Sequence, residues 1–140
     1  MHSVGLWPPP WKTNRQKIRD LHMALIGYFQ YDEKGGGSLD VAVVGKRSDS
    51  RGYAQAMFVV CQLMNLPCAL VHGRTKRGYQ VWNMVRVDRR NWYHTDAAYD
   101  DKAGCKSEFQ CKGLLRNDAE MRASHAWDPT EMPQAQKIRN

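Results

Sequence analysis

Residues 50–95 change from a helical to a strand pattern of apolar residues, and this change most limits what the chain can fold into. Over 54–64 the apolar residues recur at helical spacing and cover most of the circumference, which predicts a largely buried helix. The helix should begin at Asp49 or Ser50, since either is a good N-cap, and should stop before Pro67. Short runs rich in Val, Trp and Tyr follow at 68–71, 79–87 and 92–95. Turn residues separate these runs, so they predict a three-stranded antiparallel meander.

Weaker patterns flank this unit on both sides. Thr13 and Gln16 form a capping-box signal, and apolar residues at helical spacing follow, so a first helix should end near Tyr31. The apolar stretch at 39–44 is expected to return the chain to the core. From 97 onward the sequence is rich in loop residues, with one short helix expected over 117–123. Two helices followed by an antiparallel sheet predict an α+β domain in which the second helix packs on the sheet.

The length of 140 residues suits a single domain. Three consecutive prolines keep the start of the chain extended, so we expect an N-terminal arm over 1–12 and one domain over 13–140. The longest unbroken apolar run, 56–61, is far shorter than the roughly 20 residues of a spanning helix. No signal peptide is visible either. We therefore expect a soluble protein with no membrane partner, in a compartment that the sequence leaves unknown.

The chain is basic, with 21 Lys and Arg against 14 Asp and Glu and a net charge of +7. The middle segment, 51–100, holds seven of these cations and only three acids. Its cations are Arg51, Arg74, Lys76, Arg77, Arg86, Arg89 and Arg90. Such a surplus is typical of an anionic partner, although solubility alone explains it equally well.

Four cysteines occur, none of them in a CxxC pair or at the spacing of a structural zinc site. We therefore expect no metal site and no cofactor. Cys61 falls within the apolar helical pattern and should be a core residue, whereas Cys105 and Cys111 could close a short disulfide loop if the protein is secreted.

Three motifs resemble the transglutaminase-like family. In that family a pattern of the type Cys-x-Gly-Tyr-Ala opens a central helix, His-Ala-Trp-Asn-x-Val lies on a strand, and Trp-Tyr-x-x-Asp lies on the next. The matching stretches here are SRGYA at 50–54, QVWNMV at 80–85 and WYHTD at 92–96. The first helix and the tail over 121–133, which is similar to one in bacterial members, extend the resemblance to roughly four-fifths of the chain. It implies a papain-like fold with a central helix packed on an antiparallel sheet.

The resemblance also implies a Cys-His-Asp triad, whose three positions are Ser50, Gln80 and Asp96 in this chain. A thiol beside a histidine at a helix N-terminus becomes a nucleophilic thiolate near neutral pH. A serine hydroxyl needs a general base instead, and a glutamine amide cannot accept and return a proton. We expect Ser50 to cap the helix, Gln80 to bond Asp96 or the backbone, and Asp96 to pair with Arg51 or another cation, or to face solvent. The first hypothesis is thus a catalytically inactive domain, a pseudoenzyme.

The alternative is an acyl-transfer or hydrolytic enzyme that uses Ser50, or a cysteine that Ser50 replaces, with a non-standard histidine. His72 could lie across from Gln80, and His94 points to the same side of its strand as Asp96. His125 lies in a His-Ala-Trp-Asp sequence that copies the strand motif, but the tail has no strand pattern, so this match is taken as coincidental.

A pseudoenzyme would act as a binding or interaction module through its cleft or its basic surface. The candidate binding residues are Arg51, Arg74, Lys76, Arg77 and Trp82, although a tryptophan on a strand is more often core. An acidic peptide or protein, an anionic wall polymer or nucleic acid would suit such a surface. Degenerate transglutaminase-like domains do occur in a family that recognises DNA damage. A structural module of a larger assembly is a third, weaker hypothesis.

Overall fold

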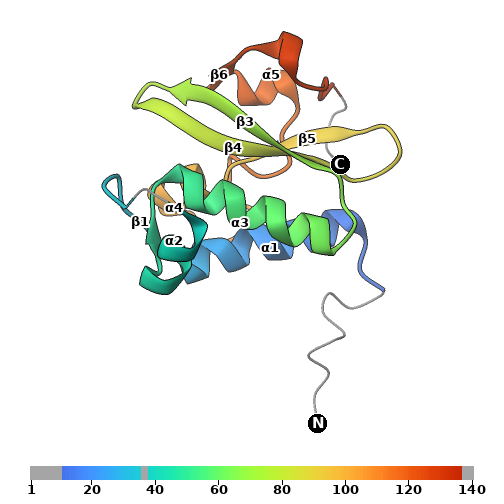
Figure 1. Ribbon diagram of the computed structural model, residues 1–140. Coiled ribbons are helices and arrows are strands. Elements are labelled where there is room, and N and C mark those ends of the chain that lie inside the picture. The colour runs from blue at the N-terminus through green and yellow to red at the C-terminus, as the bar shows by residue number, and fades with distance from the viewer. Residues whose placement is uncertain (1–10, 36–37, 137–140) are drawn as a thin grey trace.

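A central antiparallel sheet separates two layers in the computed structural model, which describes residues 11–35 and 38–136 (Figure 1). The sheet has the order β5-β4-β3-β6. Its strands are β3 (Cys68–Thr75), β4 (Gly78–Arg86), β5 (Trp92–Thr95) and β6 (Ala126–Trp127). The helices are α1 (Asn14–Tyr28), α2 (Leu39–Gly45), α3 (Ser50–Leu63), α4 (Ala97–Lys102) and α5 (Asp118–Met121), with a 3-10 turn at Pro129–Glu131. Two short parallel strands, β1 (Gln30–Tyr31) and β2 (Arg47–Ser48), form a separate pair. The α+β prediction is confirmed.

Local capping signals set the starts of the two long helices. The hydroxyl of Thr13 accepts from the N–H of Gln16, whose side chain accepts from the N–H of Thr13 in return, so α1 begins with a complete capping box. Asp49 caps α3 by accepting from the N–H of Arg51. A Cβ at Gly52 would lie 2.1 Å from Ser48 Oγ, so only glycine allows α3 to start this close to β2.

Helices α2, α3 and α4 each differ from the sequence expectation. The stretch at 39–44 forms helix α2 rather than a core segment, with Ala42 as its buried residue and Val44 85% exposed. Helix α3 is less buried than expected, because Leu63 on it is 79% exposed. Helix α4 forms directly after β5 where only loop was expected, since the carboxylate of Asp96 accepts from the N–H of Tyr99 and caps it.

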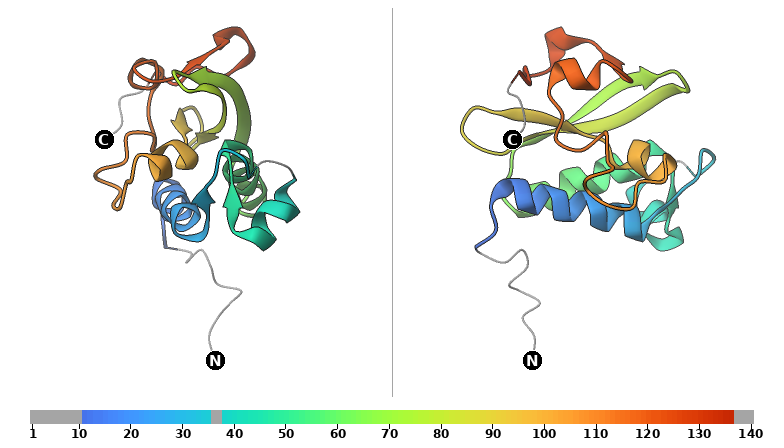
Figure 2. Two further views of the ribbon diagram at one scale, coloured as in Figure 1. Left: turned by 90° about the vertical axis from the view of Figure 1, so that its left-hand side faces the viewer. Right: turned by 180° about the vertical axis from the view of Figure 1, so that it is seen from behind.

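The sheet divides the core into two clusters. Val85 faces the cluster formed with α1, α3 and α4, whereas its neighbours Trp82 and Met84 on β4 face a second cluster with the C-terminal segment. The two views in Figure 2 show α5 on the opposite side of the sheet from α1 and α3. A Cβ at Gly73 would lie 2.2 Å from the carbonyl oxygen of Ala126, so glycine lets β6 approach β3 closely. The fold thus places the C-terminal segment against the end of β4.

The expected arm over 1–12 lies mostly outside the described residues, which begin at 11. Cys105 and Cys111 form the expected disulfide, with Cα atoms 5.4 Å apart, and Cys61 is fully buried in the core. Among the described residues, no helix combines the length and apolar character that crossing a membrane requires.

Candidate functional site

Ser50 lies at the first turn of α3, against the backbone of β4. Its hydroxyl oxygen accepts from the N–H of Val81 at 3.0 Å. Strand β5 ends at Thr95, opposite Asn83, so Val81 lies beyond the part of β4 that pairs with β5. Asp49, not Ser50, provides the N-cap. Ser50 is 4% exposed, and its hydroxyl is bonded to the backbone beside Gln80 rather than to a side chain that could take its proton.

Gln80 and Asp96 are joined by a hydrogen bond at the end of the sheet. The amide nitrogen of Gln80 donates to Oδ2 of Asp96 at 3.0 Å, and Oδ1 accepts from the N–H of Tyr99 at 3.0 Å. Both side chains are buried, with Asp96 only 1% exposed. Arg51 does not reach Asp96, because its guanidinium forms an ion pair with Asp49 instead. Of the alternatives expected for Asp96, the pairing with Arg51 and the exposure to solvent are both wrong.

His125 supplies an imidazole to Asp96 from the C-terminal segment. Its Nε2 lies 2.8 Å from Oδ2 of Asp96, and its Nδ1 lies 2.7 Å from the hydroxyl of Ser124. A neutral ring that donates from Nε2 to a carboxylate has its lone pair at Nδ1, so the Ser124 hydroxyl is the donor there. The ring packs between Trp82 and Tyr99, with each centroid distance 4.8 Å.

Sequence reasoning missed His125 because β6 has only two residues and no alternating pattern. The signal was present in the His-Ala-Trp sequence at 125–127, which copies the strand motif of the family and whose Ala126 and Trp127 form the added strand beside β3. This match is therefore not coincidental, because it brings an imidazole onto the carboxylate of the triad position.

The two histidines considered as alternative bases lie elsewhere. His94 is fully buried, where its Nδ1 accepts from the indole N–H of Trp82 at 2.9 Å and its Nε2 lies 2.8 Å from Asp118. Burial lowers the pKa of His94, partly offset by Asp118. His72 pairs with Val81 rather than Gln80, so its side chain lies on the other face of the sheet from that of Gln80. It is exposed and bonds the hydroxyl of Tyr79.

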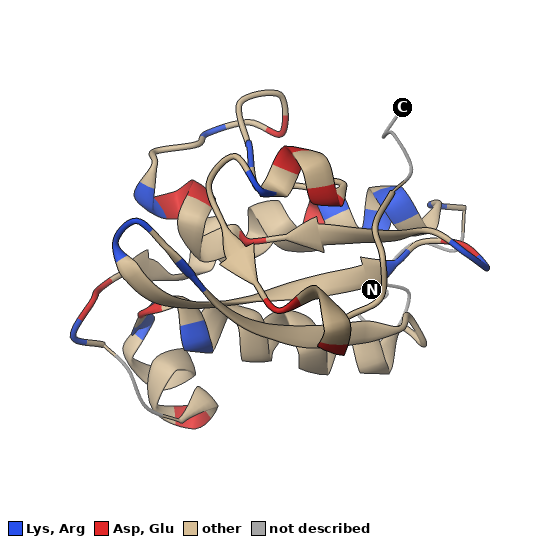
Figure 3. Cartoon of the chain, turned by 90° about the horizontal axis from the view of Figure 1, so that it is seen from above, with Lys and Arg blue, Asp and Glu red and all other residues tan. Residues whose placement is uncertain are grey.

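A pocket of about 370 Å³ opens beside Gln80. Its wall includes Tyr31, Lys76, Arg77, Gln80, Lys102 and Ser124. Lys76 and Arg77 form the turn between β3 and β4, where Figure 3 shows basic positions. Lys102 forms an ion pair with Glu33, which also lines the pocket. Burial and the nearby Glu33 raise the pKa of Tyr31.

Only two of the five predicted binding residues line this pocket, namely Lys76 and Arg77. Arg51 and Arg74 are exposed but lie outside it. Trp82 is 1% exposed and packs edge-on against His125 and Trp127, so no ligand can reach its ring. Trp82 is a core residue, and its assignment to binding is corrected.

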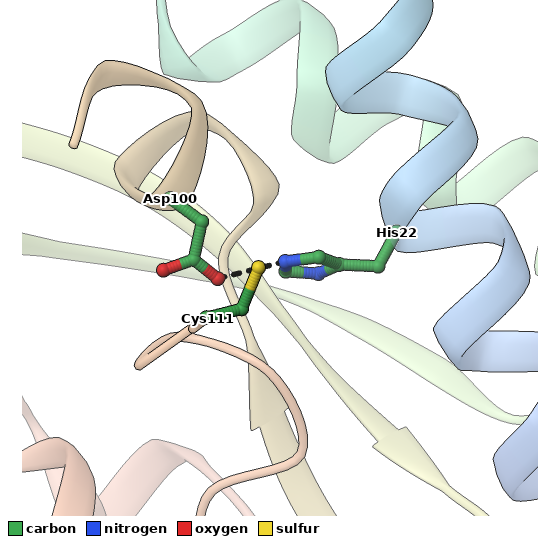
Figure 4. A group of neighbouring side chains, drawn as sticks. All are labelled: His22, Asp100 and Cys111. Atoms are coloured by element: carbon green, nitrogen blue, oxygen red, sulfur yellow. Dashed lines mark hydrogen bonds and ion pairs between the residues drawn. The ribbon is translucent and has the colours of Figure 1, made fainter. Parts of the chain in front are cut away.

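One cluster among the described residues has the composition of a metal site. His22, Asp100 and Cys111 lie close together on the helical side of the sheet (Figure 4), and each is buried. Cys111 is part of the disulfide, so its sulfur is not a thiolate ligand in this state.

Comparison with known proteins identifies the family. The sequence model of the Transglutaminase-like superfamily matches residues 10–97, more than half of the chain, and the chain belongs to this superfamily. No curated protein matches the sequence. The fold is similar to the crystal structure of "a Putative Cysteine Protease from Cytophaga hutchinsonii", with a TM-score of 0.53 and 13% identity. That match covers 59% of this chain and 30% of the other, so the chain spans less than a third of that structure.

Proposed function

We propose that this protein is a catalytically inactive transglutaminase-like domain that binds an acidic peptide or protein segment in the pocket beside Gln80. One observation carries the proposal. The amide of Gln80 occupies the triad position of the base and donates to Asp96, and an amide cannot accept and return a proton near neutral pH. The hydroxyl of Ser50 accepts from a backbone N–H, and no imidazole among the described residues is hydrogen-bonded to it.

The pocket wall supports the choice of ligand. Lys76 and Arg77 are exposed at its rim, and Gln80 and Ser124 add polar groups within reach of a ligand. Its volume of about 370 Å³ lies in the range of small-molecule and peptide side-chain sites. Carboxylates suit this combination of two cations and several hydrogen-bonding groups. A short acidic segment is the class of ligand that matches both the size and the charge.

Binding can be tested by fluorescence anisotropy with a labelled oligoglutamate peptide. Lys76→Gln with Arg77→Gln should weaken the affinity about ten-fold, the equivalent of about 1.4 kcal/mol. Arg89→Gln with Arg90→Gln is the matched control, because it removes the same charge from the turn between β4 and β5, at the other end of β4. Equal losses in both double variants would mean that the peptide responds only to net charge. Tighter binding of a nucleic-acid oligomer or a wall polymer than of the peptide would overturn the choice of ligand.

Catalytic inactivity can be tested by incubation with an activated acyl ester, followed by mass spectrometry of the intact protein and its peptides. We expect no stable adduct on Ser50, because its hydroxyl is bonded to the backbone N–H of Val81 and, among the described residues, to no general base. An acyl group on Ser50 would contradict the proposal directly.

A second candidate function, serine hydrolysis at Ser124, is favoured by one hydrogen-bonded chain. The Ser124 hydroxyl donates to Nδ1 of His125, and Nε2 of His125 donates to Asp96, while Ser124 lines the pocket. In such a reaction His125 would take the hydroxyl proton as Ser124 Oγ attacks the carbonyl, and would then give it to the leaving group. Labelling at Ser124 that is lost in Ser124→Ala and kept in Ser50→Ala would establish this second function.

Restoring the family residues tests the alignment of the site. In Ser50→Cys with Gln80→His, the thiol should titrate at a lower pH than in Ser50→Cys alone, because an imidazole would stand beside it at the start of α3. The single variant is the control, since its amide at position 80 cannot form an ion pair with a thiolate. The same thiol pKa in both variants would show that residues 50 and 80 do not face each other.

A further inference from the structure

The buried cluster of His22, Asp100 and Cys111 lies on the helical side of the sheet, apart from the pocket. His22 comes from α1, Asp100 from α4 and Cys111 from the loop that follows α4. One nitrogen, one oxygen and one sulfur atom of these residues all lie within 4.8 Å of one another, and the three residues are 0–1% exposed. Figure 4 shows the sulfur of Cys111 beside the hydrogen bond that joins the other two side chains. Imidazole nitrogen, carboxylate oxygen and thiolate sulfur are the ligands of protein-bound Zn²⁺.

Neighbouring groups hold two of these side chains in place. Nε2 of His22 lies 2.8 Å from Oδ2 of Asp100, and Nδ1 lies 2.7 Å from the hydroxyl of Thr95. The N–H of Gly113 donates to both carboxylate oxygens of Asp100. Outer contacts of this kind orient the ligands of metal sites. If a metal replaced the proton on Nε2, the proton could move to Nδ1, where the Thr95 hydroxyl can accept as well as donate.

The disulfide decides whether the third ligand is available. Cys111 is bonded to Cys105, and a disulfide sulfur has no thiolate charge with which to bind a metal ion. The segment after Cys111 is held in place independently of the disulfide, because the carbonyl of Gly113 accepts from the N–H of Asp96 at 2.7 Å. Opening the disulfide would therefore leave the sulfur of Cys111 beside His22. The loop between the two cysteines reaches the surface, because Phe109 in this loop is 92% exposed.

We propose that reduction of the Cys105–Cys111 disulfide by a low-molecular-weight thiol converts this cluster into a Zn²⁺ site. Two thiols provide two electrons and two protons, and they leave as one disulfide while Cys105 and Cys111 become thiols. Cys111 then loses its proton to solvent as its sulfur binds the ion, with Nε2 of His22 and a carboxylate oxygen of Asp100 as the other protein ligands. Water takes the fourth position, as in zinc sites with three protein ligands. This site does not depend on the proposed binding function.

The movement that the ion requires is small. Zinc–ligand distances of about 2.0–2.3 Å place tetrahedral ligand atoms about 3.4–3.7 Å apart. The nitrogen of His22 and the oxygen of Asp100 would separate from 2.8 Å to about this distance, and the sulfur would approach from within 4.8 Å. Side-chain rotations in a loop freed from its disulfide can provide such shifts.

Two single variants form a matched test. Cys105→Ser and Cys111→Ser both remove the disulfide, but only Cys105→Ser keeps the ligand thiol. With Co²⁺ as the probe, Cys105→Ser should develop a sulfur-to-cobalt charge-transfer absorption that saturates at one equivalent and is lost when Zn²⁺ is added. Cys111→Ser should show no such absorption. Cys61 and Cys68 remain in both variants, so any cobalt absorption from their thiols is the same in the two measurements.

The unmodified protein provides the second measurement, in case Cys105→Ser fails to fold. It should bind Co²⁺ in this way after treatment with a phosphine reductant and not before. The proposal is overturned if folded Cys105→Ser shows no absorption, if both variants show it equally, or if reduction of the unmodified protein leaves it unchanged. Failure of this test would leave the peptide-binding proposal untouched, because the two sites share no residue.

Discussion

Two buried histidine–carboxylate pairs lie on opposite sides of the sheet and differ in what surrounds them. His22 with Asp100 and His125 with Asp96 each have a nitrogen–oxygen distance of 2.8 Å and side chains no more than 2% exposed. The first pair is enclosed by α1 and α4, with a threonine hydroxyl on its other nitrogen. The second is joined through Ser124 and Gln80 to the wall of a pocket. The two pairs have the same nitrogen–oxygen distance, and they differ in whether a ligand can reach them. Within the described part of the chain, only the pair of His125 and Asp96 adjoins a pocket.

The C-terminal side of the sheet has fewer buried residues than the helical side, so a single large side chain should matter more there. Trp82→Ala removes the largest fully buried side chain of that cluster, together with its hydrogen bond to His94. We expect the free energy of unfolding in urea to fall by about 3–5 kcal/mol. Phe109→Ala, at a side chain that is 92% exposed, should change it by less than about 0.5 kcal/mol. A small effect of Trp82→Ala would mean that the C-terminal side does not contribute to the cooperative core.

Glycines on the two sides test the close approach of β6. Gly73→Ala should destabilise the protein by about 1–3 kcal/mol, because the new Cβ would lie 2.2 Å from the carbonyl oxygen of Ala126. Hydrogen exchange at β6 should accelerate, and the hydrogen bond between His125 and Asp96 should be lost. Gly27→Ala on α1 meets no atom within 4 Å and should stabilise the protein by about 0.5–1 kcal/mol. Equal exchange rates at β6 in Gly73→Ala and the unmodified protein would contradict the dependence on this glycine.

The same contrast explains how much of the fold the sequence could predict. On the helical side, α1 and α3 have local signals, a capping box at Thr13 and an N-cap at Asp49, together with long apolar periodicity. The meander of β3, β4 and β5 has turn residues between its strands. On the other side, β6 has two residues and is held by pairing with Gly73 and Arg74, which are more than fifty positions away in the chain. No local sequence pattern indicates a strand pairing between residues so far apart in the chain.

The candidate site shows the same contrast between local sequence signals and contacts between distant residues. The motifs placed Ser50, Gln80 and Asp96 at the start of α3 and the neighbouring ends of β4 and β5, where hydrogen bonds now link them to one another or to the adjacent backbone. The bond from Gln80 to Asp96 was among the expectations, but the imidazole partner of Asp96 could not be predicted, because His125 reaches it only through the added strand. Trp82 was ambiguous for a related reason, since only the second layer buries its outer face.

A test of the helical side asks whether local signals carry the stability there. Asp49→Ala removes the cap of α3 and the ion pair with Arg51, and should cost about 1 kcal/mol in unfolding experiments. Asp49→Ser keeps a capping oxygen without the charge and should recover most of that loss. If both substitutions cost the same, the ion pair rather than the cap would be the stabilising interaction.

The expected effect of pH belongs to the C-terminal side. Burial among Trp82 and Trp127 lowers the pKa of His94 below the ordinary value of about 6.5 that it has when unfolded. The unfolded chain therefore binds more protons as the pH falls below about 6.5, so stability from this group is complete above that pH and is lost below it. The slope is at most about 1.4 kcal/mol per pH unit. His94→Gln should flatten the curve of unfolding free energy against pH in this window, whereas His72→Gln, at an exposed ring, should leave the slope in place. An unchanged slope in His94→Gln would mean that the C-terminal side does not hold this ring away from water in solution.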